Sequence, residues 1–212
     1  MSKKAFTLIE LLIVVAIIAI LAAIAVPNFL EAQVRAKTAR CKSDMRTLAL
    51  ALESYAVDYN RYPYDGYHPT ASYAPEYNYW YIPKNISTPI AYLTTAVWPD
   101  TFRAGKSHPT AVDWQIDNYR YTNWDSTYNT MYASRTLRTT VSTVYGTYIT
   151  EFGNWRLNGA GPDKSYGPTG WVGVAVPAVT GLAIPYDATN GTVSAGDIIR
   201  SQRSPNGYIN TR

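Results

Sequence analysis

The chain has 212 residues, of which 47% are hydrophobic and 16% charged, so it has enough apolar material for a core and too little charge for an intrinsically disordered protein. Its 19 basic and 15 acidic side chains give a net charge of +4, a mild excess that does not indicate nucleic-acid binding. The single cysteine, Cys41, excludes an intramolecular disulfide and a CxxC site, and the two histidines, His68 and His108, exclude a His-rich metal site.

The first thirty residues contain a long apolar segment. From Phe6 to Leu30 the only ionisable residue is Glu10, and the run from Leu11 to Val26 contains only Leu, Ile, Val and Ala. A helix over the whole segment would be about 37 Å long, which is enough to cross a hydrocarbon layer of about 30 Å. The positive-inside rule predicts that Lys3 and Lys4 hold the N-terminus in the cytoplasm and that the rest of the chain is exported.

Three interpretations of this segment compete. A cleaved secretory signal would use the small residues at Ala23–Ala25, but apolar, helix-forming sequence continues past them and only Pro27 interrupts it. A plain membrane anchor leaves Glu10 unexplained, since a lone carboxylate in a lipid-embedded helix costs about 2–3 kcal/mol. The third interpretation is a filament subunit, in which a neighbouring copy supplies a partner for Glu10.

The sequence at residues 3–12, KKAFTLIELL, resembles the class III signal of type IV pilins and of type II secretion pseudopilins. The resemblance continues through Ile24–Phe29 and into the stretch that ends at Asp58–Pro63, so it covers about the first 63 residues. It implies a pilin-like fold and comes nearest to the major pseudopilin of type II secretion systems.

The resemblance also implies processing of the N-terminus. In that family a prepilin peptidase cuts just before the Phe and methylates the new amine, which here means cleavage between Ala5 and Phe6 and N-methylation of Phe6. The mature chain would then have 212 − 5 = 207 residues. The residue before the cut is usually Gly in the family, and Ala5 is its smallest substitute, so the expected consequence is at most slower processing.

Two residues of the apolar segment are predicted to serve assembly. After cleavage the Phe6 amine is a cation, and Glu10 of one subunit can pair with the terminus of its neighbour. Such a pair in apolar surroundings would penalise every register that leaves one charge alone. A solvated or snorkelling Glu10 is the alternative. The family resemblance assigns Pro27 a flexibility that helps the subunit move from bilayer to filament, because a proline inside a helix removes a hydrogen bond and favours a kink or local melting.

The helix is predicted to continue to about Tyr59 as an amphipathic helix. An apolar stripe follows the helical period; its members are Leu30, Val34, Cys41, Met45, Leu48, Leu52, Tyr55 and Tyr59. The opposite face carries five basic and two acidic side chains: Arg35, Lys37, Arg40, Lys42, Arg46, Glu31 and Asp44. This charged cluster indicates either a solvated helix face or contact with anionic lipid heads or an acidic neighbour. Cys41 lies on the stripe and is interpreted as a small core residue.

The rest of the chain has a different composition. All 19 tyrosines and all six tryptophans lie from Tyr55 onward, and turn residues separate short β-branched runs such as 139–150, 148–152 and 171–179. These patterns predict a short antiparallel sheet laid on the apolar stripe. Long irregular loops are expected, above all at 64–138.

No motif of a known enzyme class is present: the sequence lacks GxSxG, HExxH, GxxxxGK[ST] and GxGxxG. The prediction is therefore a non-enzyme without catalytic residues. The aromatic run Tyr77–Tyr81 would suit sugar stacking, but such runs more often pack onto their own domain or a neighbouring subunit.

Two turn-rich segments near the C-terminus carry the aspartates Asp163, Asp187 and Asp197. Calcium takes six to eight oxygens from carboxylates and carbonyls on flexible loops. The arrangement resembles the C-terminal calcium loop of the major pseudopilins, although its loop is longer here and Lys164 brings a cation close. Turn caps made by local aspartates are the equal alternative.

The sequence thus predicts an α+β, pilin-like chain. It divides into a leader at 1–5, a membrane-spanning and filament-core helix at 6–30, an amphipathic helix at 31–62 and an aromatic-rich head at 63–212. The predicted function is a structural subunit of a type IV pilus or a type II secretion pseudopilus, and the alternative is a pilus-displayed adhesin or carbohydrate-binding module. The expected location is the bacterial inner membrane with the head outside the cytoplasm. Expected partners are the prepilin peptidase, further copies, other pilins and the assembly platform, with no nucleic acid.

Overall fold

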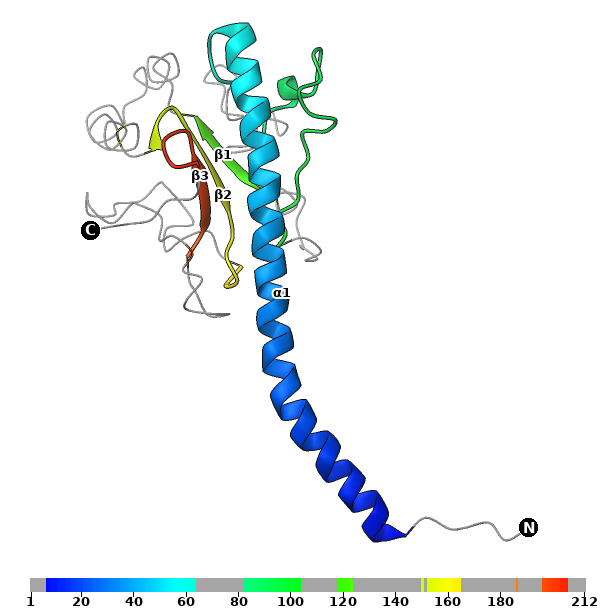
Figure 1. Ribbon diagram of the computed structural model, residues 1–212. Coiled ribbons are helices and arrows are strands. Elements are labelled where there is room, and N and C mark those ends of the chain that lie inside the picture. The colour runs from blue at the N-terminus through cyan, green and yellow to red at the C-terminus, as the bar shows by residue number, and fades with distance from the viewer. Residues whose placement is uncertain are drawn as a thin grey trace, which may run out of the picture.

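The computed structural model describes residues 7–63, 82–103, 118–123, 150, 152–164, 186 and 196–205. One helix, α1 (Leu8–Tyr59), dominates the molecule, and a small sheet packs beside its C-terminal half (Figure 1). This arrangement confirms the predicted α+β architecture.

Helix α1 is 52 residues long, and sequence signals mark both of its ends. Thr7 is the N-cap residue, and Asn60 closes the helix in the left-handed conformation with φ 52°. Asparagine tolerates that conformation better than most residues, which makes it a common helix terminator. Pro63 follows three residues later and cannot continue a helix. The predicted end near Tyr59 is confirmed.

The sheet has three antiparallel strands in the order β1-β2-β3. They are β1 (Arg120–Asn123), β2 (Trp155–Gly159) and β3 (Ile198–Ser201). Leu157 at the centre of β2 pairs with Tyr121 of β1 and with Arg200 of β3. Every residue of the central strand β2 is buried, because it has a neighbour on each side and α1 against one face.

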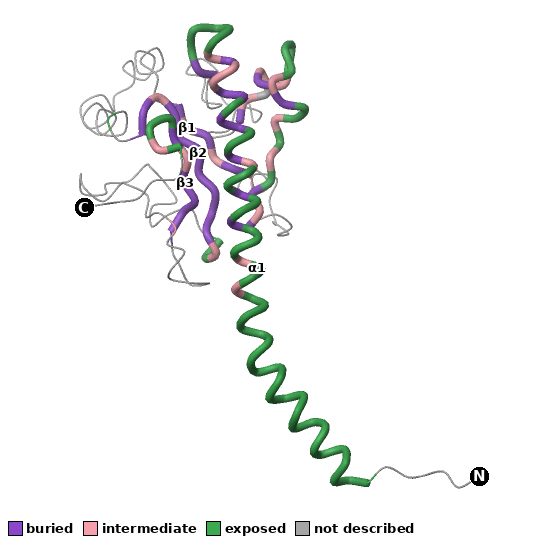
Figure 2. The backbone as a smooth tube through the Cα atoms, in the orientation of Figure 1, coloured by how far each residue is buried: buried purple, intermediate pink, exposed green. Residues whose placement is uncertain are grey.

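The core lies where α1 meets the sheet (Figure 2). Eight residues of α1 are buried: Thr38, Cys41, Met45, Leu48, Ala49, Ala51, Leu52 and Tyr55. The contact with β2 is close, since a Cβ added to Gly159 would lie 2.7 Å from Cys41 Sγ. The predicted stripe is therefore confirmed from Cys41 to Tyr55, and Val34 is half-buried and packs against the same core. It is wrong at Leu30, which is 50% exposed, and at Tyr59, which is 39% exposed and stacks on Tyr55.

Polar contacts fix the upper end of α1 to the sheet. Glu53 accepts hydrogen bonds from the Tyr62 hydroxyl at 2.8 Å and from the Trp155 indole Nε1 at 2.9 Å. The segment 82–103, with the 3-10 helix η1 (Lys84–Ile86), also contacts α1, and Asn85 donates to the Tyr55 hydroxyl. Helix, segment and sheet therefore share one core.

The predicted strand positions need correction. Strand β1 lies inside 64–138, the region expected to consist of irregular loops. Thr150 and Phe152, from the runs expected to be extended, have helical backbone. The alternation of β-branched residues was misleading because strand formation depends on which face packs on the core. Most of 139–150 and all of 171–179 lie outside the described residues.

Candidate functional site: the apolar half of α1

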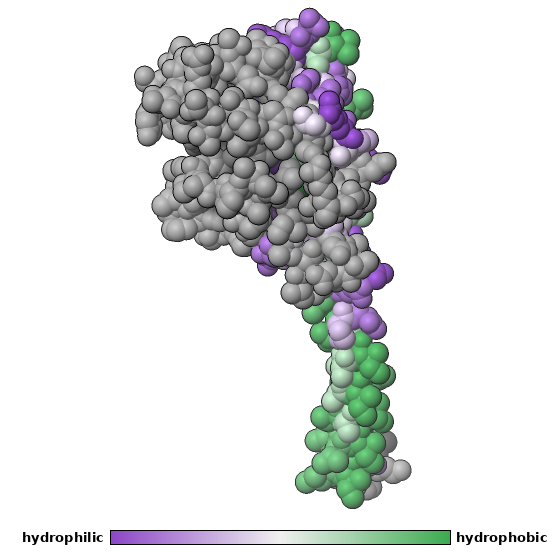
Figure 3. All heavy atoms as spheres, turned by 90° about the vertical axis from the view of Figure 1, so that its left-hand side faces the viewer, coloured by the Kyte–Doolittle hydropathy of each residue, from purple (hydrophilic) through white to green (hydrophobic). Residues whose placement is uncertain are grey.

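The N-terminal half of α1 extends away from the head as a bare apolar rod (Figures 1 and 2). Its large hydrophobic side chains from Leu8 to Leu30 are between 45% and 79% exposed. The space-filling view shows this rod as a continuous hydrophobic surface below a more polar upper part (Figure 3). By length and composition the helix can cross a membrane. An exposed apolar surface of this extent marks an interface with lipid or with other protein.

The start of α1 is held by a capping box that the sequence interpretation did not include. Thr7 Oγ1 accepts from the Glu10 backbone N–H at 3.3 Å, and Glu10 Oε2 in turn accepts from the Thr7 backbone N–H at 2.9 Å and from the Thr7 hydroxyl at 2.7 Å. The spacing Thr-x-x-Glu before an apolar run is the sequence signature of this motif and could have revealed it. Within one chain Glu10 therefore already has a partner, while the pairing with a neighbouring terminus stays a prediction.

Pro27 lies inside the helix, which continues unbroken on both sides of it. Of the two predicted effects, a kink or local melting, the helix shows no melting at Pro27, and α1 curves along its lower half (Figure 1). A proline removes one backbone hydrogen bond without ending a long helix when flanking turns remain intact. The predicted role of Pro27 in the transfer from bilayer to filament stays a prediction. Ala5 and Phe6, the predicted processing residues, lie outside the described residues.

The charged cluster begins immediately above the apolar rod. Arg35 forms an ion pair with Glu31 one turn below it. The other basic side chains, Lys37, Arg40, Lys42 and Arg46, are all exposed. Asp44 differs from the prediction, because it is half-buried and accepts a hydrogen bond from the Tyr119 hydroxyl at 2.9 Å.

Cys41 is fully buried between α1 and β2. Burial raises the pKa of its thiol well above the ordinary value, and the nearby carboxylate of Asp100 adds to the effect. A protonated, inaccessible thiol is a poor nucleophile. The interpretation of Cys41 as a packing residue is consistent with this position.

The structure brings together the two segments predicted to bind calcium, at Gly161 and Gly196. A Cβ on Gly161 would lie 2.0 Å from the Gly196 carbonyl oxygen, so the backbones next to Asp163 and Asp197 are in contact. Asp163 is exposed, whereas Asp197 is buried and accepts from Asn158 Nδ2 at 3.3 Å.

The residues around Asp197 partly fit a cation. Asn158 Oδ1, on the amide next to that carboxylate, is buried and accepts no hydrogen bond from the part of the chain that the structure describes. Such an oxygen is a ligand type that calcium takes. The described residues contain no group of three or more His, Cys, Asp or Glu side chains suited to a metal, and Asp187 lies outside them.

Comparison with known proteins finds matches for the N-terminal part of the chain, which includes the N-terminal half of α1. Residues 1–26 match the family model described as the prokaryotic N-terminal methylation motif. The first 26 residues of this chain therefore carry a prokaryotic N-terminal methylation motif. Three relatives are similar to this chain over a longer stretch than the motif, about 60 residues.

The type IV major pilin protein PilA of Myxococcus xanthus is 50% identical over 60 residues, 28% of this chain and 27% of the relative. The type II secretion system core protein G of Pectobacterium carotovorum subsp. carotovorum is 38% identical over 61 residues, 29% of this chain and 39% of the relative. The type IV wide pilus major component PilA4 of Thermus thermophilus is 49% identical over 61 residues, 29% of this chain and 47% of the relative.

The pilin-like similarity thus covers less than half the length of each of these relatives. No solved structure matches the chain.

Proposed function

We propose that this chain is a structural subunit of a type IV pilus or a type II secretion pseudopilus. The observation that carries the proposal is the exposed apolar rod of α1, most of which lies within the methylation motif and which ends where the packed head begins. In a bilayer, lipid would cover the rod. In a filament, the same surface would pack against the rods of neighbouring copies, so one surface serves both states.

The relatives support a structural role. Their names describe a major pilin, a wide-pilus component and a secretion-system core protein, and none of the three describes an enzyme. In our proposal a prepilin peptidase cleaves between Ala5 and Phe6 and methylates Phe6, the inner membrane stores the subunit, and an assembly platform adds it to the filament. The head then lies outside the cytoplasm, on a periplasmic pseudopilus or a surface pilus.

Glu10 would set the register of assembly. Its carboxylate is held at the tip of the rod by Thr7, only four residues from Phe6. When the amine of a neighbouring copy approaches, a charged pair forms in apolar surroundings, and misaligned copies leave both charges unpaired. Pro27 would supply the bend that lets the rod adjust between membrane and filament.

Processing and assembly are tested together on the native protein. We expect filaments sheared from cells, or collected after overexpression, to contain this chain with an N-methylated Phe6 as its first residue. Electron microscopy detects the filaments, and intact-mass and N-terminal analysis of the subunit identifies its first residue. A terminus at or after Val26, as a conventional signal peptidase would leave, would overturn the proposal.

We further propose that Asp163, Asp187 and Asp197 bind calcium, with Asn158 as a fourth oxygen donor. Support comes from the backbone contact between the segments of Asp163 and Asp197 and from the buried Asn158 Oδ1. A bound cation would neutralise the Asp197 carboxylate, which has only 2% of its surface exposed.

Calcium should therefore raise the melting temperature of the full chain. At a hundredfold excess over Kd the stabilisation is about 2.7 kcal/mol, or roughly 5–10 °C in a domain of this size. Thermal unfolding in detergent with calcium and with chelator measures the difference. Asp187→Ala should remove most of it, whereas Asp58→Asn, at the far end of α1, should preserve it. Identical thermal unfolding curves with calcium and with chelator would contradict the calcium site and favour the alternative, in which the aspartates are turn caps.

A further inference from the structure

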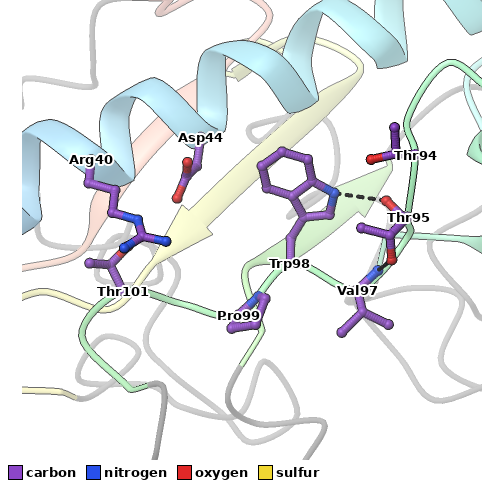
Figure 4. A pocket seen from close by; sticks show the side chains of 8 residues that line it. All are labelled: Arg40, Asp44, Thr94, Thr95, Val97, Trp98, Pro99 and Thr101. Carbon is purple, nitrogen blue, oxygen red and sulfur yellow. Dashed lines mark hydrogen bonds between the residues drawn. The ribbon is translucent and has the colours of Figure 1, made fainter.

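A pocket of about 350 Å³ lies between α1 and the segment 94–101, on the side of the head near the charged cluster (Figure 4). Arg40 and Asp44 contribute from α1, one helical turn apart, and the remaining lining residues are Thr94, Thr95, Val97, Trp98, Pro99 and Thr101. The volume lies within the range of small-molecule sites. The proposed filament function uses the apolar rod and leaves this pocket unassigned.

The pocket is preformed, because backbone and side-chain bonds hold its walls. The Trp98 indole Nε1 donates to the Thr95 carbonyl at 2.8 Å, and the Trp98 carbonyl accepts from the Tyr119 backbone N–H at 3.0 Å. The Thr95 hydroxyl accepts from the Val97 backbone N–H at 3.1 Å. Trp98 is thus fixed beside Asp44 before any ligand arrives (Figure 4). A ligand would not have to order this wall on binding.

A second network orients Asp44. Burial raises the pKa of the Tyr119 phenol, which keeps its proton and donates it to Asp44 Oδ2 at 2.9 Å. The Tyr119 oxygen lies 2.7 Å from the Thr101 hydroxyl. Because Tyr119 donates its single proton to Asp44, Thr101 must be the donor in that second bond. Asp44 Oδ1 is left without a hydrogen bond in the described part of the chain.

Arg40 offers the complementary group. Its guanidinium makes no hydrogen bond or ion pair within the described residues and points across the pocket toward Thr101 (Figure 4). Arg40 and Asp44 do not pair with each other, since the salt bridge found among the described residues joins Arg35 to Glu31. The pocket therefore presents a free set of donors and a free acceptor side by side on α1, both on the same side of the Trp98 indole (Figure 4).

The unpaired guanidinium, the unpaired carboxylate oxygen and the indole together restrict which class of ligand can bind. A phosphate or sulfate would bind Arg40 but be repelled by Asp44. A cation would bind Asp44 but be repelled by Arg40. A purely apolar ligand would leave both charged groups desolvated and unpaired. A neutral polyol on a saturated ring satisfies all three elements, since its hydroxyls both donate and accept and the C–H face of its ring covers an aromatic ring.

We propose that the pocket binds a neutral sugar residue, a hexopyranose, between Arg40, Asp44 and Trp98. Asp44 Oδ1 accepts from one sugar hydroxyl, Arg40 donates to another, and the sugar ring lies on the indole. The charge-assisted bonds supply orientation. A single sugar has about a dozen heavy atoms, so a dissociation constant of about 1–10 mM is expected.

Saturation-transfer NMR on the full chain tests the proposal, with the protein in lipid nanodiscs because many detergents carry sugar head groups. The probes are methyl β-D-galactopyranoside and methyl β-D-glucopyranoside, with inorganic phosphate as the anionic comparison. We expect saturation transfer to the ring protons of at least one sugar. Trp98→Leu and Arg40→Gln should weaken its binding by about tenfold or more, as expected when a hydrogen bond to a charged group or an aromatic wall is lost.

Arg35→Gln is the matched control, since it removes a basic residue of the same helix outside the pocket and should leave sugar affinity unchanged. Arg40 is exposed and unpaired among the described residues, so Arg40→Gln should leave the protein folded. This variant therefore tests the proposal even if Trp98→Leu unfolds the head. Three results would overturn the proposal. One is the absence of transfer to both sugars, and another is equal transfer in wild type and Arg40→Gln. The third is binding of phosphate in place of sugar. We expect Arg40→Gln to assemble filaments as the wild type does. That result would show that sugar binding in this pocket and the proposed assembly function depend on different residues.

Discussion

Replacing Glu10 by alanine is expected to abolish filament assembly while leaving the chain inserted in the membrane. The substitution removes the carboxylate at the tip of the rod, and the amine of Phe6 in the neighbouring copy then lies unpaired in apolar surroundings. Breaking one partner of a buried ion pair costs about 3–5 kcal/mol. That energy corresponds to at least about a hundredfold loss at each subunit contact. Filament counts by electron microscopy, together with membrane fractionation, measure the two effects.

The capping box supplies the controls. Thr7→Val removes the hydroxyl that contacts Glu10 but keeps the carboxylate, so it should cost about 1 kcal/mol of helix stability and still allow assembly. Glu10→Gln keeps an oxygen that can accept from the Thr7 backbone N–H but loses the charge, and it should fail as Glu10→Ala does. Normal filaments from Glu10→Gln would show that Glu10 serves only as a helix cap.

Replacing Asp100 by alanine should destabilise the head more than any surface substitution. Asp100 is fully buried, and its two carboxylate oxygens accept from the Phe102 backbone N–H at 2.8 Å and from the Ala160 backbone N–H at 2.6 Å. It thereby ties the segment 82–103 to the end of β2. Alanine would leave two buried donors without these acceptors, at about 1–3 kcal/mol each. The melting temperature should fall by roughly 8–15 °C.

Thermal unfolding of the full chain in detergent measures this loss. Asp100→Asn should be intermediate, because an amide has a single oxygen and can accept from only one of the two N–H groups. Asp58→Asn is the matched control: Asp58 is an exposed carboxylate that accepts from the Tyr92 hydroxyl, and its loss should change stability by less than about 1 kcal/mol. A loss below that value for Asp100→Ala would show that water replaces the carboxylate.

Helix α1 could be predicted almost completely from the sequence, because its signals are local. An apolar run too long for a globular core helix, a stripe at helical period and the stop at Asn60–Pro63 act within a few turns of the chain. The ends of the stripe were predicted less well. Leu30 fits the period, but it lies beyond the reach of the sheet, and periodicity does not show how far a partner layer extends.

The strands could not be placed from the sequence in the same way. β1 has only four residues, RYTN, and little of the alternating pattern of a strand. It is extended because Tyr121 and Asn123 are buried and bond to the carbonyl of Pro63, a residue about sixty positions earlier. Long-range contacts of this kind outweigh intrinsic strand preference in short segments.

The sequence by itself determined the apolar rod, the methylation motif, the end of the helix and the absence of common catalytic motifs, since each depends on residue type and short spacing. Only the tertiary structure decided which charged residues share a site. Arg40 and Asp44 belong to one cluster in the sequence, yet Asp44 accepts a hydrogen bond from Tyr119 while the Arg40 guanidinium points toward Thr101 in a pocket that Trp98 also lines. Those partners, Tyr119 and Trp98, lie far away along the chain and reach α1 only through tertiary packing.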